Sequence, residues 1–139
     1  MVLAALSAGT AGSFAPVQVQ KMFFLLDENI SAEFGGKQFN FEPYDYGPFD
    51  KNVYSELNAL QSMGLVELSY ISPTAGGRRY SPTPLGRNLG ESALASLSPN
   101  AQNFIIDVSD FVRRLTFAQL VGSIYKAFPH MREKSIFVD

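Results

Sequence analysis

The feature that most restricts the fold of this chain is a helical pattern followed directly by a β-hairpin pattern, within residues 47–82. An amphipathic helix is predicted to begin near Gly47-Pro48 and to run to Met63, and Gly64 is expected to end it. Its apolar stripe comprises Phe49, Val53, Leu57 and Leu60. Residues 65–72 then alternate between apolar and polar side chains, which predicts a half-buried strand.

The second half of this segment predicts a hairpin. Residues 73–77 contain Pro and two Gly and are expected to form the turn, and residues 78–82 the returning strand. The tip of the hairpin would be Ala75-Gly76-Gly77, with Arg78 and Arg79 beside it. On the first strand, the side chains expected on the buried face are Val66, Leu68 and Tyr70, against Glu67 and Ser69 on the other.

Five further helical segments are predicted. They begin at Val2, Pro16, Thr83-Pro84, Ser98-Pro99 and Thr116, and the first is a short helix or a frayed start over Val2–Leu6. Thr116 and Gln119 have the spacing of a capping box. The expected apolar stripes are Val19, Met22, Phe23 and Leu26, then Phe104, Val108, Phe111 and Leu115, and finally Leu120, Ile124 and Phe128.

Two interruptions in these patterns are expected. Gly86 and Gly90 are predicted to break the helical segment that starts at Thr83-Pro84. Residues 39–44 fit a short strand or extended segment that ends at Pro43.

Composition narrows the class of protein. The chain has 139 residues, 46% of them hydrophobic and 17% charged, which is typical of one globular domain with a sizeable core. There is no Cys, so disulfides, thiolate metal sites and a Cys nucleophile are excluded. The net charge is −2, and residues 47–90 are the least acidic third, with four basic and three acidic side chains. This balance disfavours strong non-specific DNA binding but leaves room for a local basic patch.

The sequence offers little for catalysis. His130 is the only His, and it lies near the C-terminus between basic neighbours, where a surface role is expected. The pair Asp27-Glu28 falls at a predicted helix end and is expected to be solvated. No His/carboxylate cluster has metal-ligand spacing, and the glycines form no phosphate-binding loop. We therefore expect a non-enzymatic protein without cofactor or metal.

The first residues, "MVLAALSAGTAGSFAP", resemble a signal peptide only in their small side chains, because they lack a positive start and a long apolar run. No stretch reaches the length needed to cross a bilayer. The expectation is a soluble, cytoplasmic protein without a membrane partner.

The segment "GLVELSY…GGRRYSPTPLG" resembles the wing of winged-helix regulators of the PadR and MarR kind. In those proteins a Gly-Leu-(Val/Ile) exit from the recognition helix leads into a hairpin that ends in Tyr-x-(Leu)-Thr-x-x-Gly. Gly64-Leu65-Val66 and the run from Tyr80 to Gly86 match this frame, with Pro82 in place of the usual Leu.

The pairing of "VQKMFFLL" with "FEPYDYGPFDKNVYSEL" is similar to bacterial winged-helix proteins related to the Panacea antitoxin domain, and "LTFAQLVGSIYKAFPHM" looks like their last helix. The resemblance spans roughly residues 16 to 131. It implies an α+β, mainly helical fold: a winged helix-turn-helix with a β-hairpin wing and C-terminal helices. We expect a single domain over residues 1–139, with the winged-helix core at about 14–90 and a C-terminal helical extension at about 91–139.

If the helix over residues 47–63 is a recognition helix, its exposed polar face would contact DNA. The six side chains predicted to do so are Lys51, Asn52, Ser55 and Asn58 on the helix and Arg78 and Arg79 on the wing. Asn and Lys can contact base edges, and Arg beside glycines can enter a minor groove. The alternative, that these are ordinary solvent-facing residues, stays open.

The function predicted from this resemblance is a winged-helix DNA-binding transcriptional regulator that acts as a homodimer. About six phosphate contacts in such a dimer would lower the affinity roughly a thousandfold between 50 and 200 mM salt. The alternative is a protein-interaction module, such as an antitoxin-like or defence-associated adaptor, that does not bind DNA directly. Tyr44, Tyr46, Phe104 and Phe111 are the candidate partner surface, and for the two Phe residues a place in the core is the alternative.

Overall fold

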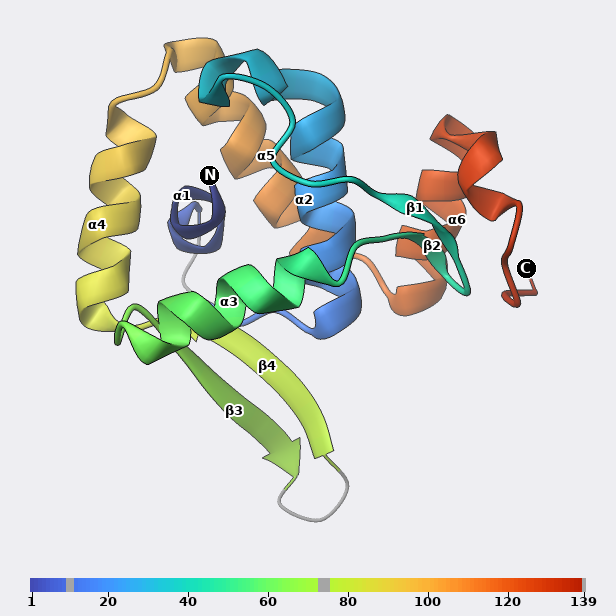
Figure 1. The fold of residues 1–139 in the computed structure, drawn as a ribbon, viewed down its shortest axis with the longest axis horizontal. Helices are drawn as coiled ribbons and strands as arrows, with labels where there is room; N and C mark the ends of the chain where they lie inside the picture. Colours follow the sequence, from blue (N-terminus) through green and yellow to red (C-terminus); the bar gives the residue numbers. More distant parts are fainter. Residues whose placement is uncertain (10–11, 73–75, 139) are drawn as a thin grey trace.

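The computed structural model describes residues 1–9, 12–72 and 76–138. In these ranges the helices are α1 (Val2–Ser7), α2 (Pro16–Ile30), α3 (Asn52–Ser62), α4 (Pro84–Ala95), α5 (Pro99–Arg114) and α6 (Phe117–Ala127), with short 3₁₀ turns η1 (Ser31–Phe34) and η2 (Pro129–Arg132). The strands are β1 (Glu42–Tyr44), β2 (Gly47–Phe49), β3 (Val66–Ser72) and β4 (Gly76–Pro82). They form two separate antiparallel hairpins, β1–β2 and β3–β4. The expected α+β, mainly helical class is confirmed (Figure 1).

Helix α2 lies at the centre of the molecule, with α1, α4 and α5 on one side and α6 on the other (Figure 1). Its predicted stripe is confirmed, because Val19, Met22, Phe23 and Leu26 are all buried in the main hydrophobic core. Phe24 faces the other way into a smaller core with Val121, Ile124, Tyr125 and Met131. The helix is therefore buried on most of its circumference.

The β3–β4 hairpin follows α3 and projects from the body of the protein (Figure 1). Gly64 ends α3 in the left-handed conformation, at φ +74°, as predicted. At the base of the hairpin, Phe14 and Tyr80 exchange two backbone hydrogen bonds of 2.8 Å, so the segment before α2 joins the edge of β4. Of the predicted tip, Ala75 lies outside the described residues.

Burial on β3 decreases along the strand. Val66 is buried and Leu68 half-buried, but Tyr70 is 56% exposed. The prediction of a buried Tyr70 is therefore wrong. The outer half of the strand extends with β4 past the body of the protein (Figure 1).

The β1–β2 hairpin corrects two predictions. The helix expected from Gly47 begins only at Asn52, because Gly47–Phe49 pairs with Glu42–Tyr44 as strand β2. Pro43 lies within β1 and does not end it. Gly47 has φ +100°, a conformation that suits the end of a tight turn and that other residues rarely adopt.

The C-terminal helices follow their sequence signals closely. Ser98 caps α5 by accepting the N–H of Ala101, and Thr116 and Gln119 form the expected capping box of α6. The α5 stripe is displaced, however: its fully buried residues are Ala101, Ile105, Val108, Ser109 and Val112, whereas Phe104, Phe111 and Leu115 are half-buried at the edge of the main core. Helix α5 contacts both α1 and α2, so its buried face is a broad stripe of small and β-branched residues.

Helix α4 is continuous, contrary to the predicted break at its glycines. Both glycines are buried at close contacts. A Cβ at Gly86 would collide with the backbone oxygen of Leu65, and one at Gly90 with Ser7 and the backbone oxygen of Leu3. These glycines thus allow α4 to approach its neighbours rather than end it.

No helix in the described part of the chain is both long enough and apolar enough to span a bilayer.

Gly90→Ala tests the close packing of α4 on α1. We expect it to lower the free energy of unfolding by about 1–3 kcal/mol, because the added methyl group has no space. The matched control is Gly122→Ala in α6, where a Cβ meets nothing within 4 Å and the better helix propensity of Ala should raise stability by up to about 1 kcal/mol. Urea denaturation measures both, and equal effects would contradict the packing described for Gly90.

Candidate functional site

Buried polar side chains of α2 hold the segment that contains the β1–β2 hairpin. Gln20 bonds both backbone groups of Asp50, donating to its oxygen at 2.9 Å and accepting from its N–H at 3.0 Å. Asp27 accepts the backbone N–H groups of Gln38 and Phe39 at 3.0 and 2.9 Å. The prediction of a solvated Asp27 is wrong, because this carboxylate is buried. Both ends of the segment are therefore fixed to one helix.

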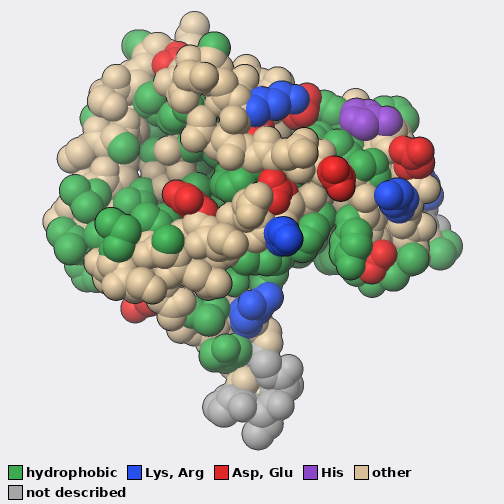
Figure 2. Space-filling view, viewed as in Figure 1, with side chains coloured by type: hydrophobic (Ala, Val, Ile, Leu, Met, Phe, Trp, Pro, Cys, Tyr) green, Lys and Arg blue, Asp and Glu red, His purple; other side chains and the backbone are tan. Residues whose placement is uncertain are grey.

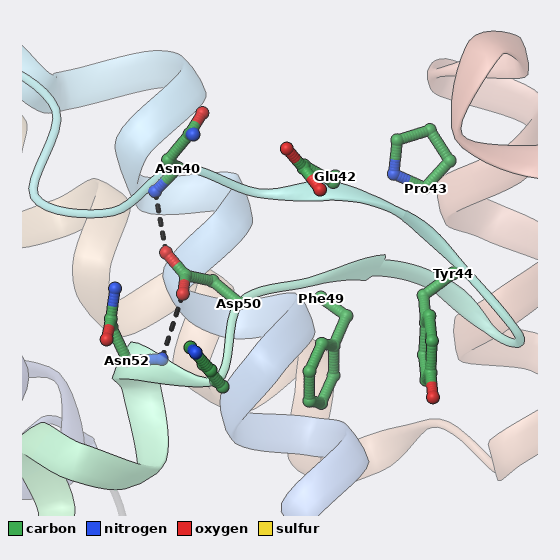
Figure 3. Close-up of a pocket in the computed structure, with 8 residues that line it drawn as sticks. Asn40, Glu42, Pro43, Tyr44, Phe49, Asp50 and Asn52 are labelled. Carbon is green, nitrogen blue, oxygen red and sulfur yellow. Dashed lines mark hydrogen bonds between the residues drawn. The ribbon is translucent and has the colours of Figure 1, made fainter.

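Asp50 organises the start of α3. Its carboxylate accepts the backbone N–H of Asn40 at 2.7 Å and that of Asn52 at 2.8 Å (Figure 3). One side chain therefore joins the segment before β1 to the first turn of α3. Such a bond satisfies an N–H group at a helix start that has no partner within the helix. The sequence analysis did not identify this role.

Next to this segment lies a pocket of about 400 Å³, which we call the aromatic groove. Its lining residues are Pro16, Val17, Gln20, Lys21, Tyr44, Asp45, Tyr46, Gly47, Phe49, Tyr54 and Phe117. Three of its rings remain substantially exposed: Tyr44 (53%), Tyr46 (40%) and Phe117 (43%). The rings contact each other in two pairs, with centroids 4.9 Å apart for Tyr44 and Phe49 and 5.1 Å apart for Tyr46 and Phe117.

The C-terminal segment fixes the outer end of the groove. The backbone oxygen of Asp45 accepts the N–H of Ile136 at 2.9 Å and the hydroxyl of Ser135 at 3.2 Å. The ring of Phe137 lies 6.0 Å from that of Phe117. The turn between β1 and β2 is therefore held from both sides, by α2 and by residues 135–137.

Lys21 is the one basic side chain that lines the aromatic groove, and it is only 3% exposed. Its Nζ donates to the backbone oxygen of Pro48 at 3.3 Å. Within the described residues, no carboxylate lies within 4 Å of this amine, although Asp45 lines the same groove. Desolvation by burial lowers the pKa of Lys21 from 10.5 to about 8. The protein thus holds a poorly compensated amine beside exposed aromatic rings.

A second pocket, of about 350 Å³, adjoins the groove. It is lined by Asn40, Glu42, Pro43, Tyr44, Phe49, Asp50, Lys51 and Asn52. The rings of Tyr44 and Phe49 belong to both pockets and lie side by side on one side of the β1–β2 hairpin (Figure 3). The two pockets therefore meet at this pair of rings.

The helical residues predicted to contact DNA share an exposed face. Lys51 and Asn52 lie at the start of α3, and Ser55 and Asn58 follow on its exposed side. Arg78 of β4 lies next to α3, because its guanidinium carbon is 5.5 Å from the ring centroid of Tyr54 in the first turn of that helix. On the side of the molecule shown in Figure 2, the basic side chains are scattered and do not gather over α3 and the hairpin.

Arg79 is placed differently. Successive residues of a strand point to opposite faces, so Arg79 lies on the side of the hairpin away from Arg78. Its Nε donates to the hydroxyl of Ser13 at 3.1 Å, and its Nη2 donates to the backbone oxygen of Ser13 at 3.3 Å. The structure therefore does not bring the two arginines together.

The candidate partner surface also divides into two parts. Tyr44 and Tyr46 are exposed and line the aromatic groove. Phe104 and Phe111 are half-buried against the main core on α5. The sequence analysis missed Phe117 and Lys21, and the available signal for Lys21 was a single Lys within the otherwise apolar run "KMFFLL".

In the described ranges, no group of three or more acidic or His side chains is arranged to hold a metal ion. No family model, curated protein or solved structure matches the chain.

Lys21→Met should show how much the buried amine lowers the free energy of unfolding. Because the folded-state pKa lies below that of the unfolded chain, protonation of Lys21 destabilises the protein fully below pH 8, and this cost disappears as the pH rises towards 10.5. We expect Lys21→Met to raise the free energy of unfolding at pH 7 by on the order of 2 kcal/mol, after loss of the Pro48 hydrogen bond.

Urea denaturation of both proteins between pH 7 and pH 10.5 measures this difference. The advantage of the variant should shrink with rising pH, and taking the difference cancels the contribution of Tyr54, whose pKa is raised by burial. A variant that is less stable than the wild type at every pH would contradict the account of an uncompensated amine.

Proposed function

We propose that this chain is a protein-interaction module that binds a partner protein through the aromatic groove. The observation that carries the proposal is a pocket of about 400 Å³ that is lined by three exposed aromatic side chains, Tyr44, Tyr46 and Phe117. Tyr is enriched among residues that dominate binding energy, and grouped exposed rings mark interaction surfaces in soluble proteins.

The backbone around the groove supports this proposal. The β1–β2 segment is fixed by Gln20, Asp27 and the C-terminal residues 135–137, so that little ordering is left for the moment of binding. A pre-formed site loses less conformational entropy when a partner binds. The groove is also built from the Tyr-Gly-Pro segment that resembles Panacea-related proteins, which favours an antitoxin-like or defence-associated adaptor.

A second candidate function is DNA binding as a winged-helix homodimer. The observation that favours it is the order of α3 and the projecting β3–β4 hairpin, with Lys51 at the start of α3 and Arg78 next to that helix. Few cations are available there, because Arg79 lies on the other side of the hairpin, where it donates hydrogen bonds to Ser13. Two cations from each protomer give about four phosphate contacts in a dimer, for which the affinity would fall roughly a hundredfold between 50 and 200 mM salt.

The protein-binding proposal predicts a large difference between two tyrosines of similar exposure. Tyr44 in the groove is 53% exposed, and Tyr70 on the outer part of β3 is 56% exposed. A photoreactive phenylalanine analogue at position 46 should crosslink a partner protein in an extract of the source cells. Calorimetry with that purified partner should then show that Tyr44→Ala weakens binding about tenfold or more and Tyr70→Ala less than about threefold.

The matched control is the same analogue at position 70. A partner crosslinked equally from both positions, or equal losses in the two alanine variants, would remove the groove from the binding surface.

The DNA proposal predicts that a labelled duplex from the region upstream of the reading frame binds with the salt dependence given above. Lys51→Ala/Arg78→Ala should abolish this binding, whereas the control Arg114→Ala/Lys126→Ala, which removes two exposed cations from α5 and α6, should change it little. Fluorescence anisotropy measures both. Absence of binding at low salt would exclude this function.

A further inference from the structure

We propose that the partner segment bound in the aromatic groove carries an Asp or Glu whose carboxylate pairs with the amine of Lys21, next to a hydrophobic side chain that packs among the rings. This inference rests on the proposed protein-binding function and specifies the chemistry of the partner. It makes Lys21 a residue that determines specificity.

The first argument is the state of the amine. A protonated Lys has three N–H donors, and the described structure gives Lys21 one acceptor, the backbone oxygen of Pro48 at 3.3 Å. A buried charge without a close counter-charge costs free energy that a bound anion recovers. Lys21 is one of the residues that line the groove, so a segment bound there lies next to its side chain and can supply the counter-charge.

The second argument is the surrounding surface, which selects the type of anion. The other titratable side chains that line the groove are Tyr44, Asp45, Tyr46 and Tyr54. A nucleic-acid backbone requires a row of cations, and the groove offers one amine among rings. A single carboxylate attached to an apolar segment of polypeptide matches both features.

The second pocket meets the groove at the Tyr44–Phe49 pair, and Lys51 is exposed there. An extended segment can therefore cross the hairpin and meet a second cation beyond it. Asp45 and Glu42, one in each pocket, repel a continuous run of acids, so separate carboxylates between hydrophobic residues are favoured.

The experiment selects peptides on the folded chain without knowledge of the partner. A phage library of random peptides, embedded between Gly/Ser linkers so that no free C-terminus is presented, is selected on the wild type, and clones that also bind Tyr44→Ala are removed. We expect the remaining peptides to share an Asp or Glu beside a large hydrophobic residue.

The decisive comparison is a double-mutant cycle. An enriched peptide and its Glu→Gln or Asp→Asn form are measured by calorimetry against the wild type, Lys21→Met and Lys51→Met. On the wild type, neutralising the peptide should weaken binding about tenfold or more, and on Lys21→Met less than about threefold. The control Lys51→Met should keep most of the wild-type difference.

A second readout follows proton uptake. At pH 9, above the lowered pKa of about 8, Lys21 is largely neutral in the free protein. A carboxylate at its amine would raise that pKa, so the complex should take up a fraction of a proton from the buffer on binding. This uptake is measured as a binding enthalpy that depends on the ionisation enthalpy of the buffer. Lys21→Met should show no such dependence.

The outcomes separate the two proposals. Groove-dependent peptides that lack acids, or an equal effect of peptide neutralisation on the wild type and Lys21→Met, would overturn the carboxylate inference and leave the protein-binding function standing. A selection that yields only peptides insensitive to Tyr44→Ala would count against both.

Discussion

The structure depends on a helix that is buried on most of its circumference. Once α2 is enclosed by two hydrophobic cores, its polar side chains have to find partners inside the protein. Gln20 and Asp27 do so by bonding the backbone of residues 38–50, at both ends of the β1–β2 segment. The hairpin that carries Tyr44 is therefore positioned by α2 and by residues 135–137, in addition to the pairing of its own two short strands.

The same enclosure produces a site that is costly for the isolated chain. Lys21 shares the helix with Gln20 and Asp27, but it finds only one carbonyl oxygen. The poorly compensated amine lowers the stability of the free protein, and the exposed rings contribute little to it. In the proposed complex, an apolar, acidic partner surface would offset the cost of the amine and bury the rings. A trade of stability for binding of this kind is common where a protein has an interaction site.

Local signals in the sequence were sufficient for much of the fold. Caps at Ser98 and Thr116 and the hairpin after Gly64 all follow rules that act over a few residues. The helix start predicted at Gly47-Pro48 was wrong, because the same dipeptide suits both a helix start and a tight turn. Only the pairing of Gly47 with Tyr44 decides between the two. Of the site, Tyr44 and Tyr46 could be proposed from composition, whereas Lys21 could not, since its burial arises from elements distant in sequence.

The proposed role of the groove depends on Lys21 being a buried amine without a close counter-charge in the free protein. The most direct test is an NMR titration of the Lys21 side-chain Cε signal, assigned by its absence in Lys21→Met. The account predicts a pKa of about 8. A pKa at the ordinary value of 10.5 would show that the amine is solvated or paired, and would contradict the account of the groove as a site awaiting a carboxylate.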